Sequence, residues 1–284
     1  MSPALTKQRT VKQPATLIGV SLHTGEHVTL TLRPAPPNHG IKFKRKDLPD
    51  EPTISASIDN VRMVERATTL EEGNIKVHTV EHMLSALAGL QVDNAIVEMD
   101  ANEPPIADGS ARPYVELIEK AGIEEQDAPR RIFDIREPIS IETKSGSTLV
   151  ILPDKTFRVS CTQVGPNGSH TQFFSIEVTP DSYRLEIAPA RTFVHYEDIQ
   201  PLMEKGLIKG GSLENAVVIK GDVATSKEPM RFPEEFARHK ILDIIGDLAL
   251  FGQPIRGHVV AVKPGHAANT ELARAIQKQH SAMR

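Results

Sequence analysis

Cysteine is almost absent from this chain of 284 residues, which contains only Cys161 and no tryptophan. A single cysteine cannot form an intrachain disulfide, and it excludes the zinc modules that use several cysteine ligands. Any metal ion must therefore be bound by histidine, aspartate or glutamate side chains. The scarcity of cysteine is also typical of proteins from a reducing compartment.

Long hydrophobic runs are lacking as well. No segment approaches the roughly 18 apolar residues of a membrane span, and residues 1–20 lack the continuous apolar core of a secretory signal. The formal charge of -4, from 33 Lys and Arg against 37 Asp and Glu, lacks the basic excess of a nucleic-acid-binding protein. We therefore expect a cytoplasmic protein that spans no membrane and binds no nucleic acid. We also expect it to be a monomer.

The composition is that of a soluble globular protein, with 39% hydrophobic and 25% charged residues. The length suits two domains. Residues 123–131 are mostly polar and contain a proline, so this segment is predicted to be a linker. It would separate a first domain, residues 1–127, from a second domain, residues 128–284.

Apolar periodicity predicts similar elements in both halves. Strands are predicted over residues 15–20, 26–32, 93–99, 132–141, 148–152, 157–163, 172–178 and 257–263. Helices are predicted between the N-cap Thr79 and Gly89, and over residues 111–121, 195–205, 234–251 and 269–281. Both halves close with the same order of helix, glycine, strand, turn and helix. We therefore predict an internal duplication in which the helices ending near 89 and 251 face each other.

The helix predicted over residues 234–251 carries His239, Asp243 and Asp247 at successive four-residue intervals. Such residues lie along one face of a helix. The residues between them are apolar, so the polar face is buried and something must satisfy it. That partner is either a bound cation or a hydrogen-bond network. Catalytic zinc usually takes three protein ligands, so a zinc site here needs one more ligand from elsewhere in the chain.

His82 is the candidate for the additional ligand. Residues 78–82 match the pattern H-x-x-E-H, in which two histidines bind zinc beside a glutamate base in inverted metallopeptidases. If Thr79 caps the helix, however, His78 lies outside it and only His82 remains as a ligand. The predicted duplication would bring His82 to His239 and Asp243. A metallopeptidase that uses His78, and an inactive binding protein with a buried polar network, remain as alternatives.

Several further side chains are candidates for catalysis. Glu81 could act as a general base, although a glutamate in the first turn also compensates the positive end of a helix. His266, in a turn after a strand, is either a general acid or a surface histidine. Asp247 could orient His266, as the third member of a catalytic triad orients its base. Lys240 and Thr192 are candidates for contact with an oxyanion.

The chain also resembles a known family. The segments that carry the resemblance are Leu22-His23-Thr24-Gly25, Thr79-Val80-Glu81-His82, Pro105-Ile106-Ala107-Asp108-Gly109-Ser110-Ala111, Ala190-Arg191-Thr192-Phe193, Gly210-Gly211-Ser212, Arg238-His239-Lys240-Ile241-Leu242-Asp243-Ile244-Ile245-Gly246-Asp247 and Gly265-His266-Ala267. In this order they resemble the UDP-3-O-acyl-N-acetylglucosamine deacetylases, bacterial zinc amidases of lipid A biosynthesis. The match extends over nearly the whole chain.

The resemblance implies an α+β fold of two similar domains, each a β-sheet layer packed on two α-helices, with the active site between the domains. It implies Zn²⁺ bound by His82, His239 and Asp243, with Glu81 as the base. His266 would be the acid or a cationic stabiliser, oriented by Asp247.

The resemblance also implies residues that contact UDP-3-O-acyl-N-acetylglucosamine, the small-molecule substrate. These are Thr192, Phe193, Lys240 and Gly211. Insertions near 39–57 and 194–218 would complete the site, and the second would form an apolar passage for the acyl chain. The family does not need a histidine at position 78, so His78 is expected to have no role.

Overall fold

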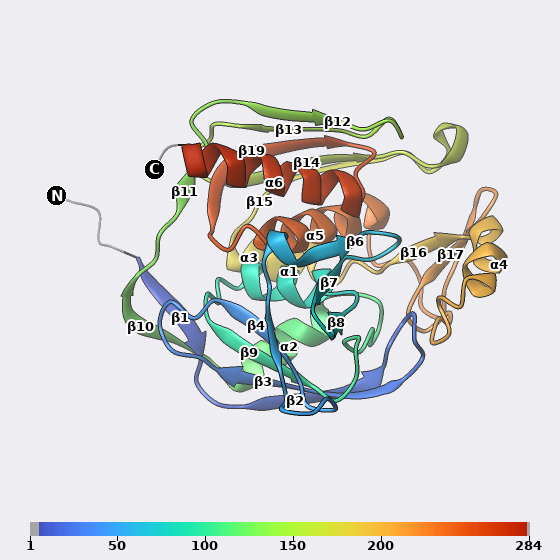
Figure 1. Ribbon diagram of the computed structural model, residues 1–284. Coiled ribbons are helices and arrows are strands. Elements are labelled where there is room, and N and C mark those ends of the chain that lie inside the picture. The colour runs from blue at the N-terminus through green and yellow to red at the C-terminus, as the bar shows by residue number, and fades with distance from the viewer. Residues whose placement is uncertain (1–5, 283–284) are drawn as a thin grey trace.

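The computed structural model describes residues 6–282. Two β-sheets form its outer layers, with the main helices packed between them (Figure 1). The helices in the middle layers are α1 (Glu81–Gly89), α2 (Arg112–Ala121), α5 (Glu235–Ala249) and α6 (His266–Ala282). This arrangement confirms the α+β fold of two similar halves.

The two sheets share one topology. The first has the order β2-β3-β9-β4-β5, with β2 (Ala15–Val20), β3 (His27–Pro34), β9 (Ala95–Met99), β4 (Ile41–Arg45) and β5 (Thr53–Ser55). The second has the order β12-β13-β19-β14-β15, with β12 (Ile139–Glu142), β13 (Thr148–Leu152), β19 (Ile255–Val262), β14 (Phe157–Gln163) and β15 (Gln172–Glu177). In each order the third strand is parallel to the fourth, and the other neighbours are antiparallel. The second sheet has one more strand, β11 (Phe133–Asp134), which pairs in parallel with β19. The predicted internal duplication is therefore confirmed.

Alternating burial along the strands explains why each sheet turns one face to the helices. In β3 the buried residues are Val28, Leu30 and Leu32, and the residues between them are partly exposed. In β19 they are Ile255, Gly257, Val259 and Ala261. A shift by one residue would turn these apolar side chains to solvent, so burial fixes the register of both sheets.

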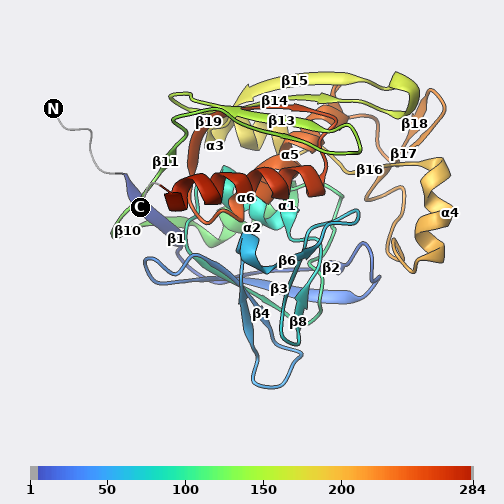
Figure 2. The same cartoon turned by 45° about the horizontal axis from the view of Figure 1, so that its top comes forward.

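Helices α1 and α5 pack directly against each other in the centre of the molecule, as the duplication predicts (Figure 2). Gly246 makes this close approach possible, since a Cβ atom there would lie 2.1 Å from the carbonyl oxygen of Glu81. Every residue of α1 except Ala88 is buried. His82 of α1 therefore faces His239 and Asp243 of α5 inside the protein.

Each half carries an additional small unit, which lies along the chain between β5 and β9 in the first half and between β15 and β19 in the second. In the first half this is the sheet of β6 (Val61–Met63), β7 (Thr69–Glu72) and β8 (Ile75–Val77). In the second half it contains β16 (Phe193–His195), α4 (Tyr196–Glu204), β17 (Val217–Lys220) and β18 (Val223–Thr225), which project at the right of Figure 1. The expected first insertion near 39–57 is therefore wrong, because that segment forms β4 and β5 of the main sheet.

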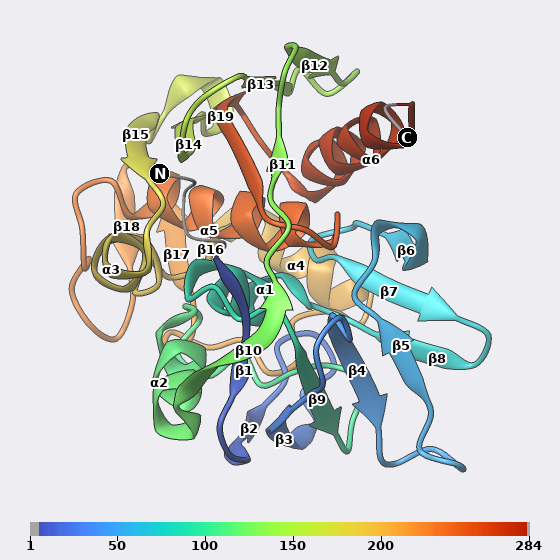
Figure 3. The same ribbon diagram turned by 90° about the vertical axis from the view of Figure 1, so that its left-hand side faces the viewer.

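The structure corrects other local expectations. The predicted linker at 123–131 is wrong, since β10 (Ile123–Pro129) pairs with β1 (Lys7–Val11) (Figure 3). The strand predicted over 132–141 is divided into β11 (Phe133–Asp134) and β12. A short helical segment, α3 (Pro180–Ser182) continuing to Ile187, was not predicted. Within residues 6–282, no helix has both the length and the apolar character needed to cross a membrane.

Candidate metal centre

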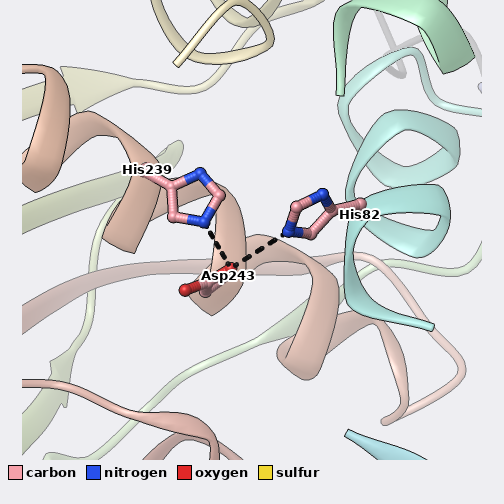
Figure 4. A group of neighbouring side chains, drawn as sticks. All are labelled: His82, His239 and Asp243. Carbon is pink, nitrogen blue, oxygen red and sulfur yellow. Dashed lines mark ion pairs between the residues drawn. The ribbon is translucent and has the colours of Figure 1, made fainter. Parts of the chain in front are cut away.

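The facing sides of α1 and α5 bring His82, His239 and Asp243 together (Figure 4). One potential ligand atom from each residue lies within 4.8 Å of the others. Asp243 Oδ1 is 3.9 Å from His82 Nε2 and 3.5 Å from His239 Nε2. All three side chains are buried. The structure thus brings together the three residues predicted to be ligands.

The carboxylate of Asp243 presents one oxygen to the two imidazoles. Its Oδ2 accepts a hydrogen bond of 2.8 Å from Lys240 Nζ. Its Oδ1 is buried and accepts no hydrogen bond from residues 6–282. Burial raises the pKa of this carboxyl, but the surrounding positive charges, of which Lys240 contributes most, together outweigh burial and hold the pKa below its usual value. A buried anionic oxygen without a donor is costly, so its environment fits a bound cation.

Both imidazoles suit the same cation. Burial lowers the pKa of His82 to about 3 and also lowers the pKa of His239, so both rings are neutral at physiological pH. His239 Nδ1 lies 3.0 Å from the carbonyl oxygen of Ala190. A carbonyl can only accept, so Nδ1 carries the proton and the lone pair of Nε2 is available to a metal. Two neutral nitrogens and one carboxylate are a donor set suited to zinc and similar ions.

A buried ion pair holds the segment that contains Ala190. Arg191 Nε donates to Glu235 Oε1 at 2.8 Å, and Arg191 Nη2 donates to the carbonyl oxygen of Pro229 at 2.9 Å. Glu235 is the first residue of α5, the helix that carries His239. The pair therefore fixes the carbonyl of Ala190 relative to the ring that it orients.

Glu81 and His266 lie beside the three clustered residues. His266 Nε2 is 3.6 Å from Glu81 Oε1, and His266 Nδ1 is 2.9 Å from Asp247 Oδ2. Burial lowers the pKa of His266, but the negative charges of Asp247 and Glu81 outweigh burial and raise it to about 10. Burial raises the pKa of the Glu81 carboxyl. The structure thus brings the predicted base, the predicted acid and its predicted orienting carboxylate together.

Of the residues expected to contact a substrate, Phe193 and Lys240 lie beside the clustered ligands. Phe193 stacks edge to face with His239, at 6.3 Å between ring centroids, and Lys240 Nζ is 5.2 Å from the Phe193 centroid. Thr192 is fixed by its N–H, which donates to the carbonyl of Gly109 at 2.8 Å. Gly211 is exposed in a turn closed by its N–H to the carbonyl of Ile208.

His78 lies outside this group. Its Nδ1 is 2.9 Å from the hydroxyl oxygen of Thr69. The expected N-cap role of Thr79 is wrong: Val80 occupies that position, and the Thr79 hydroxyl donates to Glu103 Oε1 at 2.7 Å. The backbone φ of 52° at Thr79 turns the chain between His78 and helix α1. The two histidines of the H-x-x-E-H pattern therefore do not share a helix face.

Two residues of the site, Thr68 and Asn269, have no recognisable sequence signal. Thr68 donates its N–H to Glu81 Oε2 at 3.0 Å and its hydroxyl to Asp247 Oδ1 at 2.6 Å. Asn269 donates to Asp247 Oδ2 at 2.9 Å. Neither belongs to a motif, and both reach the site only through tertiary packing.

Comparison with known proteins is consistent with this geometry. Residues 8–278 match the family described as UDP-3-O-acyl N-acetylglycosamine deacetylase (LpxC). A protein of Myxococcus xanthus named UDP-3-O-acyl-N-acetylglucosamine deacetylase is 44% identical over 282 residues, covering 99% of this chain and 90% of the relative. A protein of the same name from Teredinibacter turnerae is 43% identical, covering 97% and 92%.

The alignment covers a smaller share of a longer relative. The bifunctional enzyme LpxC/FabZ of Bacteroides thetaiotaomicron is 40% identical over 303 residues, which cover 96% of this chain but 65% of that relative. The match to the family model and the similarity to the relatives from Myxococcus xanthus and Teredinibacter turnerae each extend over almost the whole chain. The protein therefore belongs to the UDP-3-O-acyl N-acetylglycosamine deacetylase (LpxC) family.

Proposed function

We propose that this protein hydrolyses the 2-acetamido group of UDP-3-O-acyl-N-acetylglucosamine and so releases acetate and UDP-3-O-acyl-glucosamine. This reaction commits the nucleotide sugar to lipid A biosynthesis. The observation that carries the proposal is the buried group of His82, His239 and Asp243 beside Glu81 and His266. The names of the relatives support the choice of substrate.

Zinc is the metal that we propose for this group, because two histidines and a carboxylate leave room for a water molecule and substrate. A zinc ion in such a donor set acts as a Lewis acid, which polarises a carbonyl group and lowers the pKa of water. The ammonium group of Lys240 donates a hydrogen bond to the second carboxylate oxygen of Asp243, Oδ2, and neutralises its charge. That contact leaves Oδ1 as the oxygen directed at the histidines.

Glu81 and His266 are the groups that we propose to move protons. Glu81 accepts a proton from water as the water oxygen forms a bond to the amide carbon. His266, as a cation with Nδ1–H bound to Asp247, stabilises the negative charge that develops on the amide oxygen. When the carbon–nitrogen bond breaks, the nitrogen receives a proton from Glu81 or His266. The products are acetate and an amine.

The proposed substrate contacts come from the start of β16, from α5 and from the turn after α4. Thr192 and Lys240 would contact the developing oxyanion or the sugar, and Phe193 and Gly211 would line the path of the substrate. The insertion at 194–218 would contact the acyl chain. Three exposed apolar side chains support this proposed contact: Tyr196 and Met203 on α4, and Leu213 in the segment after α4.

We further propose that the protein acts in the cytoplasm as a monomer and binds no nucleic acid, in keeping with its charge of -4. The division into residues 1–127, carrying Glu81 and His82, and residues 128–284, carrying the other ligands and His266, stays a prediction. It falls inside β10, so the covalent connection between the halves is itself part of a paired strand.

An acetate-release assay on UDP-3-O-acyl-N-acetylglucosamine, with and without a chelator, tests the proposal. We expect acetate release that the chelator abolishes and added Zn²⁺ restores. A metal-containing protein that releases no acetate would contradict the proposed activity. A metallopeptidase is the weaker alternative, because His78 bonds with Thr69 instead of joining the other histidines.

A further inference from the structure

Thr68 connects the two sides of the site. It belongs to no sequence motif and lies immediately before strand β7. The residue is fully buried. Its N–H donates to Glu81 Oε2 at 3.0 Å, and its hydroxyl donates to Asp247 Oδ1 at 2.6 Å. Glu81 belongs to α1 and Asp247 to α5. A single residue from the additional unit of the first half is therefore bonded to both central helices.

The direction of these hydrogen bonds follows from chemistry. An ionised carboxylate can only accept, so the Thr68 hydroxyl must direct its proton to Asp247. The other Asp247 oxygen, Oδ2, accepts from His266 Nδ1 and from Asn269 Nδ2, each at 2.9 Å. Within residues 6–282, the Thr68 hydroxyl is the donor recorded for Oδ1. Without that hydroxyl, an oxygen of a fully buried carboxylate loses its partner.

The contacts form a nearly closed ring. From Thr68 they lead to Glu81, across 3.6 Å to His266 Nε2, from His266 Nδ1 to Asp247, and back to the Thr68 hydroxyl. Hydrogen bonds to a charged acceptor are short and directional. They fix the rotation of the Asp247 carboxylate, and the carboxylate in turn fixes the His266 ring. The relative positions of Glu81 and His266 thus depend on Thr68.

We propose that Thr68 is a positioning residue for hydrolysis: it holds Glu81 and the Asp247–His266 pair in one arrangement across the boundary between the halves. Within residues 6–282, the hydrogen bonds of the Thr68 N–H and hydroxyl lead to Glu81 and Asp247 and not to the three clustered ligands, so Thr68 acts through its two carboxylate partners. This inference rests on the proposed function, because it assigns a role within that reaction.

Thr69 provides a matched control. It is the next residue, it is also buried, and its hydroxyl is 2.9 Å from His78 Nδ1. Replacing either threonine by valine removes one buried hydroxyl and keeps the shape of the side chain. Only the replacement at position 68 removes a contact of the site. A purely structural role of buried threonines in this segment therefore predicts similar effects of the two changes.

The test measures kcat and KM for acetate release by the zinc-loaded full-length protein and its Thr68→Val, Thr68→Ser and Thr69→Val variants. We expect Thr68→Val to lower kcat about tenfold to a hundredfold, as the misplacement of catalytic groups does, with KM and bound zinc nearly unchanged. Thr68→Ser keeps both donors and should retain most of the activity. Thr69→Val should retain it as well, with a thermal midpoint lowered as much as that of Thr68→Val.

Several outcomes would overturn the inference. They are a kcat of Thr68→Val equal to that of Thr69→Val, a Thr68→Ser variant as impaired as Thr68→Val, and a loss of bound zinc that explains the loss of activity. If Thr68→Val does not fold, Thr68→Ala removes the same hydroxyl without filling its space and gives the same comparison. A wild-type protein that releases no acetate would instead contradict the proposed function, and the role of Thr68 would fall with it.

Discussion

His82 Nε2, in the first turn of α1, lies 3.9 Å from Asp243 Oδ1 in the middle of α5. The two residues come from opposite halves of a duplicated fold, and neither half alone contains the three clustered ligands. The close packing of α1 on α5 at Gly246 brings them together. The candidate metal centre is therefore a property of the interface between the halves.

Replacing Glu81 by glutamine should leave the metal bound and lower kcat by about 10²-fold or more, because the amide cannot accept a proton from water. The change keeps the size of the side chain and can keep the contact with the Thr68 N–H. Steady-state kinetics together with metal analysis of the purified variant provide the measurement. Turnover close to that of the wild type would exclude Glu81 as the base.

Replacing Asp247 by asparagine should move the alkaline limb of the kcat/KM profile to lower pH. His266 acts in its protonated form, and the charge of Asp247 is the main influence that raises its pKa against the effect of burial. Without that charge the pKa falls, so the active form is lost at a lower pH, by about one unit or more. A pH–rate profile with an unchanged alkaline limb would mean that His266 does not act as a cation.

Replacing Gly246 by alanine should separate the two central helices. The added Cβ would lie 2.1 Å from the carbonyl oxygen of Glu81, so the backbone of α1 or α5 has to move. We expect the free energy of unfolding to fall by about 1–3 kcal/mol, as in other overpacked cores, and acetate release to fall with it. Chemical denaturation gives the first quantity.

Gly265→Ala is the control for this change in stability, because nothing lies within 4 Å of a Cβ at position 265. A Gly246→Ala protein as stable as this control would show that α1 and α5 can separate without cost.

Much of the fold could be predicted from local pattern. Alternation of apolar and polar residues in the sequence made β3 recognisable, and the repeated order of helix, strand and helix indicated the duplication. The segment 123–131 was misjudged because a polar edge strand such as β10 has few buried residues and looks like a linker. The role of Thr79 was misjudged because a threonine before a helix usually caps the helix. Here the hydroxyl of Thr79 donates its hydrogen bond to Glu103 instead.

Part of the site could also be predicted from local sequence pattern. His239, Asp243 and Asp247 lie on one helix, so their spacing alone places them on one face. His82 was a candidate from the H-x-x-E-H pattern and His266 from its place in a turn after a strand, but only the predicted duplication and the family resemblance joined them to the other residues of the site. Thr68, Asn269 and the carbonyl of Ala190 were not found, because their contacts join segments far apart in the chain and leave no pattern in it.

The most direct test of this account is the metal content of the purified protein and of its His82→Ala, His239→Ala and His78→Ala variants. We predict about one divalent metal ion per chain in the wild type and in His78→Ala, and a large loss in the other two variants. His82 and His239 lie on different helices, so a loss of metal from both variants would show that the two halves bind one ion. Full retention of metal by His239→Ala, with loss in His78→Ala, would contradict the account.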